Sequence, residues 1–236
     1  MEMVKNTHPL KGQKMTGAEM IVQILADQGV DVIFGYSGGA ILPTYDAVFR
    51  YNAENTDENG VEPMPLIVPA NEQGAGFMGA GYARASGKVG AVLVTSGPGA
   101  TNTVTPVRDC MADSTPIVVI CGQVPTAAIG TDAFQEAPVN SCLGPVAKHT
   151  FLVTDPKKLE STVRTAFEIA RTGRPGPVVI DLPKDVQNWQ GEFQGEGLLP
   201  VPGYRQRLHA ARHNLLDDRK LARFYGMLDA SKRPLI

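Results

Sequence analysis

The sequence carries almost no net charge. Its 236 residues include 22 Lys and Arg against 24 Asp and Glu, which gives a formal net charge of −2. A chain without an excess of positive charge offers no electrostatic footprint for nucleic acid or for an anionic membrane surface. We therefore expect no nucleic-acid partner and no membrane partner.

Long apolar runs, cysteines and metal-ligand spacings are also scarce. No run of residues is long and apolar enough to span a bilayer, and residues 1–14 lack the apolar core of a signal peptide. The three cysteines, at positions 110, 121 and 142, are odd in number and show no metal-ligand spacing. These features predict reduced thiols, no metal ligands within this sequence and a cytoplasmic location.

What the sequence does contain is a repeated strand–turn–helix pattern. A capping box at 16–19 starts the first helix, which we expect to end at Gly29. Apolar strands are predicted at 30–34, 66–68, 89–95, 116–121 and 177–182, and further helices at 41–51, 72–87, 103–112 and 156–172. Residues 52–63 and 126–149 are predicted to be loops, the second with short helical pieces. This alternation predicts an α/β fold in which helices cover both faces of a parallel sheet.

The amino-acid composition of the sequence changes after Asp185. We expect residues 1–14 to be a flexible N-terminus and residues 15–186 to be the main domain. Residues 187–207 are rich in Gln, Gly and Pro and are predicted to be a linker. Residues 208–236 are then the start of a truncated second domain, with a helix at 216–228 and a strand beginning at 233–236.

Glu72 stands at the start of a helix that has almost no polar side chains. A lone glutamate in a first turn is usually a solvated charge that the helix dipole favours. The residues behind Glu72 are mostly Gly, Ala, Phe and Met, and a helix that is apolar all round is expected to be buried. The carboxylate should therefore point into the interior or a cleft, where it needs a partner such as a ligand.

Two glycine-rich turns, 35–40 and 96–102, each follow a predicted strand. Ligands of parallel α/β sheets gather at the carboxyl ends of the strands. In the second turn, glycines permit close backbone approach and Asn102 offers both a donor and an acceptor, although an ordinary turn with Asn102 as a helix cap fits equally well. The G-x-G-x-x-G match at 74–79 lies inside a helix and lacks a later acidic residue, so close helix packing explains it better than dinucleotide binding.

Six ordered motifs together resemble one family. They are Phe34–Ala40, Asn71–Gly74, Thr95–Asn102, Gly122–Pro125, Gly130–Glu136 and Gly173–Pro177. In this order they resemble the N-terminal, pyrimidine-binding (Pyr) domain of the acetohydroxyacid (acetolactate) synthases, over roughly residues 15–186. The resemblance implies the thiamine-diphosphate-binding fold. Two departures are Ser37, where the family commonly has proline, and Gly144, where it commonly has arginine.

The resemblance also implies roles for individual residues. Glu72 matches the glutamate that hydrogen-bonds a ring nitrogen of the cofactor's aminopyrimidine and favours its imino tautomer, which takes the proton from the thiazolium carbon. The other matched cofactor-binding residues are Tyr36, Gly38, Pro98, Asn102 and Gln135, with Ser114 and Arg174 at flavin-contacting positions. Residues that match substrate-facing positions are Phe134, Gln135 and Lys184, and Ala40 and Pro125 match the access channel.

For the function, the resemblance implies condensation of pyruvate, after decarboxylation, with a second 2-keto acid such as pyruvate or 2-ketobutyrate, in branched-chain amino-acid biosynthesis. Implied cofactors are thiamine diphosphate, Mg²⁺ held by a C-terminal domain that this sequence lacks, and FAD without a redox role. Implied partners are a second copy, through the Pyr domain, and a diphosphate-binding domain in cis or in trans. The chain alone is then expected to be inactive.

Two alternatives remain open. One is another carboligase or decarboxylase that uses the same cofactor. The other is a non-catalytic remnant or a regulatory Pyr-domain module.

Overall fold

The computed structural model describes residues 8–213 and 217–234. Contacts divide the chain into two compact units, Met1–Leu199 and Pro200–Ile236. The second unit contains helices α9 (Tyr204–His213) and α10 (Asp218–Ala230). Of the expected flexible N-terminus, residues 1–7 lie outside the described residues, and so do residue 216 of the expected helix 216–228 and the last two residues of the expected final strand.

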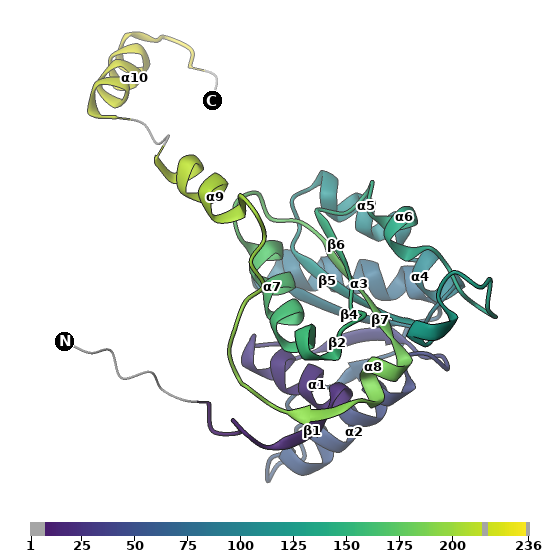
Figure 1. Ribbon diagram of the computed structural model, residues 1–236. Coiled ribbons are helices and arrows are strands. Elements are labelled where there is room, and N and C mark those ends of the chain that lie inside the picture. Colours follow the sequence, from purple (N-terminus) through teal and green to yellow (C-terminus); the bar gives the residue numbers. More distant parts are fainter. Residues whose placement is uncertain (1–7, 214–216, 235–236) are drawn as a thin grey trace. The chain divides into compact units, whose positions relative to one another are not determined.

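The first unit is built on a six-stranded sheet in the order β3-β2-β4-β5-β7-β6 (Figure 1). All neighbouring strands in this sheet are parallel. The strands are β2 (Ile33–Tyr36), β3 (Leu66–Ile67), β4 (Gly90–Val94), β5 (Ile117–Gln123), β6 (His149–Leu152) and β7 (Val178–Pro183). Their carboxyl ends therefore meet at one edge of the sheet, hereafter the carboxyl edge.

Two layers of helices cover the sheet. Helices α1 (Gly17–Asp27), α2 (Leu42–Asn55), α7 (Leu159–Arg171) and α8 (Lys184–Asn188) pack with one another in one layer. The other layer consists of α3 (Glu72–Ser86), α4 (Pro98–Thr101), α5 (Val104–Ala112) and α6 (Val139–Leu143). Short 3₁₀ turns lie at Thr126–Ala128 and Pro156–Lys158. The predicted fold class, a parallel sheet with helices on both faces, is confirmed.

Local sequence signals explain the helix starts. The predicted capping box is present, since the Thr16 hydroxyl accepts from the Glu19 N–H at 3.2 Å and the Glu19 carboxylate accepts from the Thr16 N–H at 2.7 Å. Helix α3 begins after Asn71, whose side chain accepts from the Gly74 N–H at 2.8 Å, and ends at Gly87, which has a φ of 73°. These caps fix where α3 starts and therefore where Glu72 lies.

Burial of α3 differs from the expectation. Its inner face packs closely because of its glycines: a Cβ on Gly76 would lie 2.4 Å from the Pro106 side chain, and one on Gly79 would lie 2.8 Å from Val92. This confirms close packing as the reason for the glycine pattern. The helix is not buried all round, however, because Phe77 and Met78 on its outer face are 41% and 43% exposed.

Three short strands, β1, β6 and β8, were not predicted. Strand β1 (Lys14–Thr16) pairs antiparallel with β8 (Gln190–Glu192), and β6 begins at the last residue of the predicted loop 126–149. Gln187 is fully buried, and its Nε2 donates to the Ala40 carbonyl at 2.7 Å. The predicted linker 187–207 is therefore wrong for its first residues, which belong to the packed first unit.

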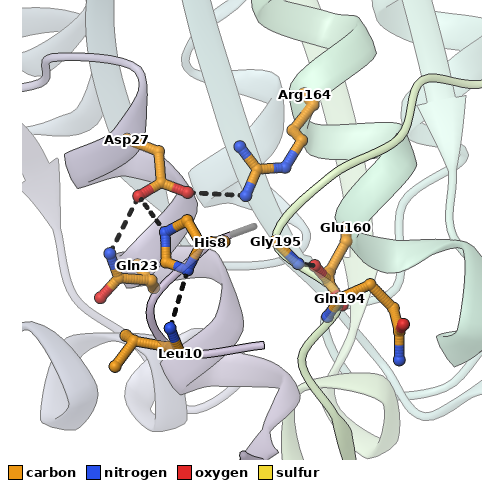
Figure 2. A network of polar contacts seen from close by, with 8 residues as sticks. All are labelled: His8, Leu10, Gln23, Asp27, Glu160, Arg164, Gln194 and Gly195. Atoms are coloured by element: carbon orange, nitrogen blue, oxygen red, sulfur yellow. Dashed lines mark hydrogen bonds and ion pairs between the residues drawn. The ribbon is translucent and has the colours of Figure 1, made fainter. Parts of the chain in front are cut away.

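Two groups of polar contacts attach the start of the described chain and the segment after β8 to helices α1 and α7 (Figure 2). His8 and Arg164 both contact the Asp27 carboxylate, at 3.1 and 2.6 Å, and Glu160 accepts from the backbone N–H groups of 194 and 195 at 2.8 and 3.0 Å. Burial works against ionisation of Asp27, but hydrogen bonds led by that from Arg164 hold its pKa below the usual value. Residues 8–14 are thus attached to the domain.

Candidate functional site

Glu72 lies at the carboxyl edge of the sheet, in the first turn of α3. Its side chain is only 7% exposed, and its Oε2 accepts a hydrogen bond from Asn102 Nδ2 at 2.9 Å. Burial of a carboxylate is costly unless the group is paired, so this hydrogen bond offsets part of the cost of burying Glu72. The expected inward orientation of Glu72 is confirmed.

The two glycine turns meet beside Glu72. A Cβ on Gly99 would lie 2.7 Å from Thr95 Cγ2 and 3.5 Å from Glu72 Oε1, and a Cβ on Gly38 would lie 2.5 Å from the same methyl group. The Thr95 hydroxyl also accepts from the Ala40 N–H at 3.3 Å. Thr95, which the sequence analysis quoted within a motif but gave no role, is therefore the side chain around which both turns pack.

Tyr45 on α2 is a further neighbour that the sequence analysis missed. Its hydroxyl donates to the Leu93 carbonyl at 3.1 Å, and burial, followed by the negative charge of Glu72, raises its pKa. Tyr36, at the end of β2, is 37% exposed, and Pro98 is exposed at the start of α4. All of these residues follow or flank strand ends at the carboxyl edge.

The loop 130–137 approaches the second glycine turn. Gln135 has a φ of 58°, and a Cβ on Gly97 would lie only 2.6 Å from the Gln135 carbonyl oxygen. Glycine at 97 thus permits this backbone contact. Phe134, in contrast, is 87% exposed. The structure brings the Gln135 backbone to the turn that carries Asn102 and leaves the Phe134 ring in solvent.

Lys184 lies at the same edge, directly after β7. It is half-buried and lines a groove of about 330 Å³ together with Leu42 and Asp46. An apolar groove of about 370 Å³ lies nearby along α2, and its lining includes Ser37 and Tyr45. The proline-to-serine departure is therefore on the wall of this second groove.

Ser114 and Arg174 contact each other, but at the opposite edge of the sheet. Arg174 Nε donates to Ser114 Oγ at 2.8 Å, and its Nη2 donates to the Met111 and Ala112 carbonyls at 3.0 and 2.9 Å. Both residues precede their strands, β5 and β7, whereas Glu72 follows β3. The described contacts of Arg174 are those of a cap on the end of α5.

Neither a metal cluster nor a membrane helix is found in the part of the chain that the structure describes. No group of three or more His, Cys, Asp or Glu side chains there is arranged to hold a metal ion. Within the same residues, none of the helices is both long enough and apolar enough to cross a membrane.

The fold and this edge define an α/β ligand-binding domain, with a buried carboxylate between two glycine turns. The family model described as "Thiamine pyrophosphate enzyme, N-terminal TPP binding domain" matches residues 15–142, and the chain belongs to this family. The resemblance seen in the sequence is thereby confirmed.

Several curated relatives are acetolactate synthases. The catalytic subunit of the mitochondrial enzyme from Aspergillus candidus is 54% identical over 171 residues, covering 72% of this chain and 23% of the relative. The large subunit from Corynebacterium glutamicum is 45% identical over 193 residues, covering 82% of this chain and 29% of the relative. The large subunit from Lactococcus lactis is 41% identical over 228 residues, covering 96% of this chain and 37% of the relative. The chain therefore spans only about a quarter to a third of the length of these relatives.

Proposed function

We propose that the protein to which this sequence belongs is a thiamine-diphosphate-dependent acetolactate synthase, in which this chain supplies the pyrimidine-binding part of the site. Such an enzyme condenses pyruvate, after decarboxylation, with a second 2-keto acid. The observation that carries the proposal is the buried Glu72 carboxylate, which Asn102 holds between the two glycine turns. The names of the relatives support the same activity.

The residues at the carboxyl edge suit a pyrimidine ring. Asn102 fixes one oxygen of Glu72, and Gly99 lies beside the other oxygen, Oε1, from which a Cβ at this position would be 3.5 Å away. We infer that Glu72 meets a ring nitrogen and moves a proton there, with Tyr36 and Pro98 beside the ring. Gly38 lines the same pyrimidine pocket. The bound cofactor itself supplies the electron sink for decarboxylation.

The remaining assignments are part of the same proposal. Phe134, Gln135 and Lys184 face the 2-keto acid, and Ser114 and Arg174 contact a flavin. Mg²⁺ and the diphosphate are held by another domain, in cis or in trans. The chain pairs with a second copy through its Pyr domain, and the enzyme works in the cytoplasm.

Expression from the complete reading frame tests this function. With pyruvate, thiamine diphosphate and Mg²⁺, we expect acetolactate to form. Glu72→Gln is expected to lower kcat/KM by at least about 100-fold, because it removes the group that exchanges a proton with the ring. The matched control is Glu58→Gln, on an exposed loop, which should leave kcat/KM unchanged.

Three other outcomes would contradict parts of the proposed function. Full activity in Glu72→Gln would refute the role of Glu72. A decarboxylation product without carboligation would identify another enzyme of this cofactor class. Calorimetry that detects thiamine diphosphate binding without any turnover would favour a non-catalytic module.

A further inference from the structure

A buried hydrogen-bonded pair, Gln123 and Asp181, lies under the loop 130–137. Gln123 is the last residue of β5 and Asp181 lies on the neighbouring strand β7, and their side chains are 2% and 3% exposed. Gln123 Nε2 donates to Asp181 Oδ2 at 3.2 Å and to the Ala137 carbonyl at 3.0 Å. One amide group therefore links the centre of the sheet to the end of the loop.

The orientation of this amide is fully specified. Both groups that Nε2 meets are acceptors, and Gln123 Oε1 meets a donor, the Val124 N–H, at 2.9 Å. If the amide were flipped, Gln123 Oε1 would face the Ala137 carbonyl oxygen and Asp181 Oδ2, and these are acceptors as well. The Asp181 carboxylate thus fixes the end of Gln123 that faces Ala137.

Ala137 is the point at which the loop is attached. Within residues 131–137 it is the one buried residue, while Phe134 and Gln135 are exposed. Glu136 stabilises the loop internally by accepting from the Gly130 and Ala133 N–H groups. Those bonds set the shape of the loop, whereas the Gln123 bond to Ala137 and the close approach at Gly97 attach it to the sheet and to the second glycine turn.

Asp181 is a costly residue for a purely structural position. Its Oδ1 is buried and has no hydrogen-bond partner among the described residues. Burial raises its pKa to about 7, with a smaller contribution from the negative charge of Glu136, although the Gln123 bond opposes this shift. An apolar residue in the middle of a parallel strand would avoid that cost.

We propose that Gln123 and Asp181 are positioning residues that hold the loop 130–137 in place, so that Phe134 and Gln135 are presented to the substrate. The last clause rests on the proposed function. The attachment of the loop does not.

The test compares variants of the protein expressed from its complete reading frame. Gln123→Met alone leaves Asp181 without its partner, so the main variant is the double substitution Gln123→Met with Asp181→Leu, which replaces both polar groups. Asp181→Asn keeps an acceptor for Gln123. Ile120→Val, on the same strand, is the control for a small loss of packing, and thermal unfolding checks that each variant is folded.

Amide hydrogen exchange is the first readout, and it is independent of catalysis. In the double variant we expect amide exchange across residues 130–136 to be at least about tenfold faster, which is the effect of losing one hydrogen bond. The exchange rates in β4 should stay unchanged. Asp181→Asn and Ile120→Val should match the parent. Parent-like exchange in the double variant, or equally fast exchange in Ile120→Val, would overturn the proposal.

The second readout is the split between KM and kcat. We expect the double variant to raise KM for pyruvate at least about fivefold with a smaller change in kcat, since the loop acts on substrate placement. Asp181→Asn, which keeps an acceptor for Gln123, should keep the KM of the parent. Faster exchange with an unchanged KM would overturn the role toward the substrate, and a parent protein without turnover would refute the proposed function while the exchange result still decides the attachment.

Discussion

At the scale of single residues, two buried acidic side chains, Glu72 and Asp181, lie in different surroundings. Glu72 meets the Asn102 amide in the turn that follows β4, whereas Asp181 lies within the sheet beside Gln123, and one of its oxygens has no partner among residues 8–213 and 217–234. An unpaired buried oxygen favours the neutral acid over the carboxylate. Asp181 is therefore expected to make folding depend on pH.

Asp181→Asn tests this dependence. The folded pKa of about 7 lies above the usual value of 3.8, so the folded protein keeps a proton that the unfolded chain releases. Stability from this residue is therefore full below pH 4, falls as pH rises toward 7 and stays low above it. Between pH 5 and pH 8, urea unfolding should show the parent losing about 2–3 kcal/mol relative to Asp181→Asn. An equal difference at both pH values would contradict the assignment.

Prediction of the site from sequence succeeded where the signal was local. The apolar sequence of α3 indicated that Glu72 points inward, and the structure confirms it. Thr95 and Tyr45 were missed because their importance depends on strands and helices distant in sequence. Gln123 stood within a quoted motif, but its partner Asp181 is 58 positions away, and no spacing indicates such a pair.

At the scale of elements, the second glycine turn packs against one methyl group, Thr95 Cγ2. Gly99→Ala is expected to destabilise the protein by about 1–3 kcal/mol, because the new Cβ would lie 2.7 Å from Thr95 Cγ2. Adding Thr95→Ser removes that methyl group and keeps the hydroxyl that accepts from Ala40. The double variant should recover most of the loss, as measured by urea unfolding in a double-mutant cycle. Additive effects of the two substitutions would show that the clash is not the cause.

Elements were predictable where their own sequence carries the pattern. The strands β3, β4, β5 and β7 and the helices α1 and α3 were found within a few residues, since each has an apolar run or a cap. Strand β2 begins at Ile33, later than expected, and α2 extends to Asn55. The strands β1, β6 and β8 have only three or four residues and exist through pairing with distant partners, which local periodicity does not report.

At the scale of the whole chain, the first unit is completed by residues that lie beyond the predicted domain end. Gln187 forms hydrogen bonds with Thr44 and Ala40. Phe193 is fully buried and packs edge-to-face with the His8 ring, with 5.0 Å between the two ring centroids. Residues 187–195 thus contribute core contacts, so the stable unit extends past Val186.

Two truncated chains check this boundary. A chain that ends at Leu199 is expected to unfold cooperatively, because it contains every core residue of the first unit. A chain that ends at Val186 should be less stable by at least about 3 kcal/mol, the cost of losing one buried phenylalanine side chain, before the Gln187 bonds are counted. Urea unfolding followed by circular dichroism measures both. Equal midpoints would show that residues 187–199 are dispensable.

The pairing of β1 with β8 also bears on how the protein is made. Thr16 faces Gln190, so 190 − 16 = 174 positions separate the two partners. At synthesis rates of about 5–20 residues per second, the ribosome needs roughly 9 to 35 seconds to deliver the second partner after the first. Throughout that interval β1 has no β8 to pair with, and the pairing waits for residues 190–192 to leave the exit tunnel.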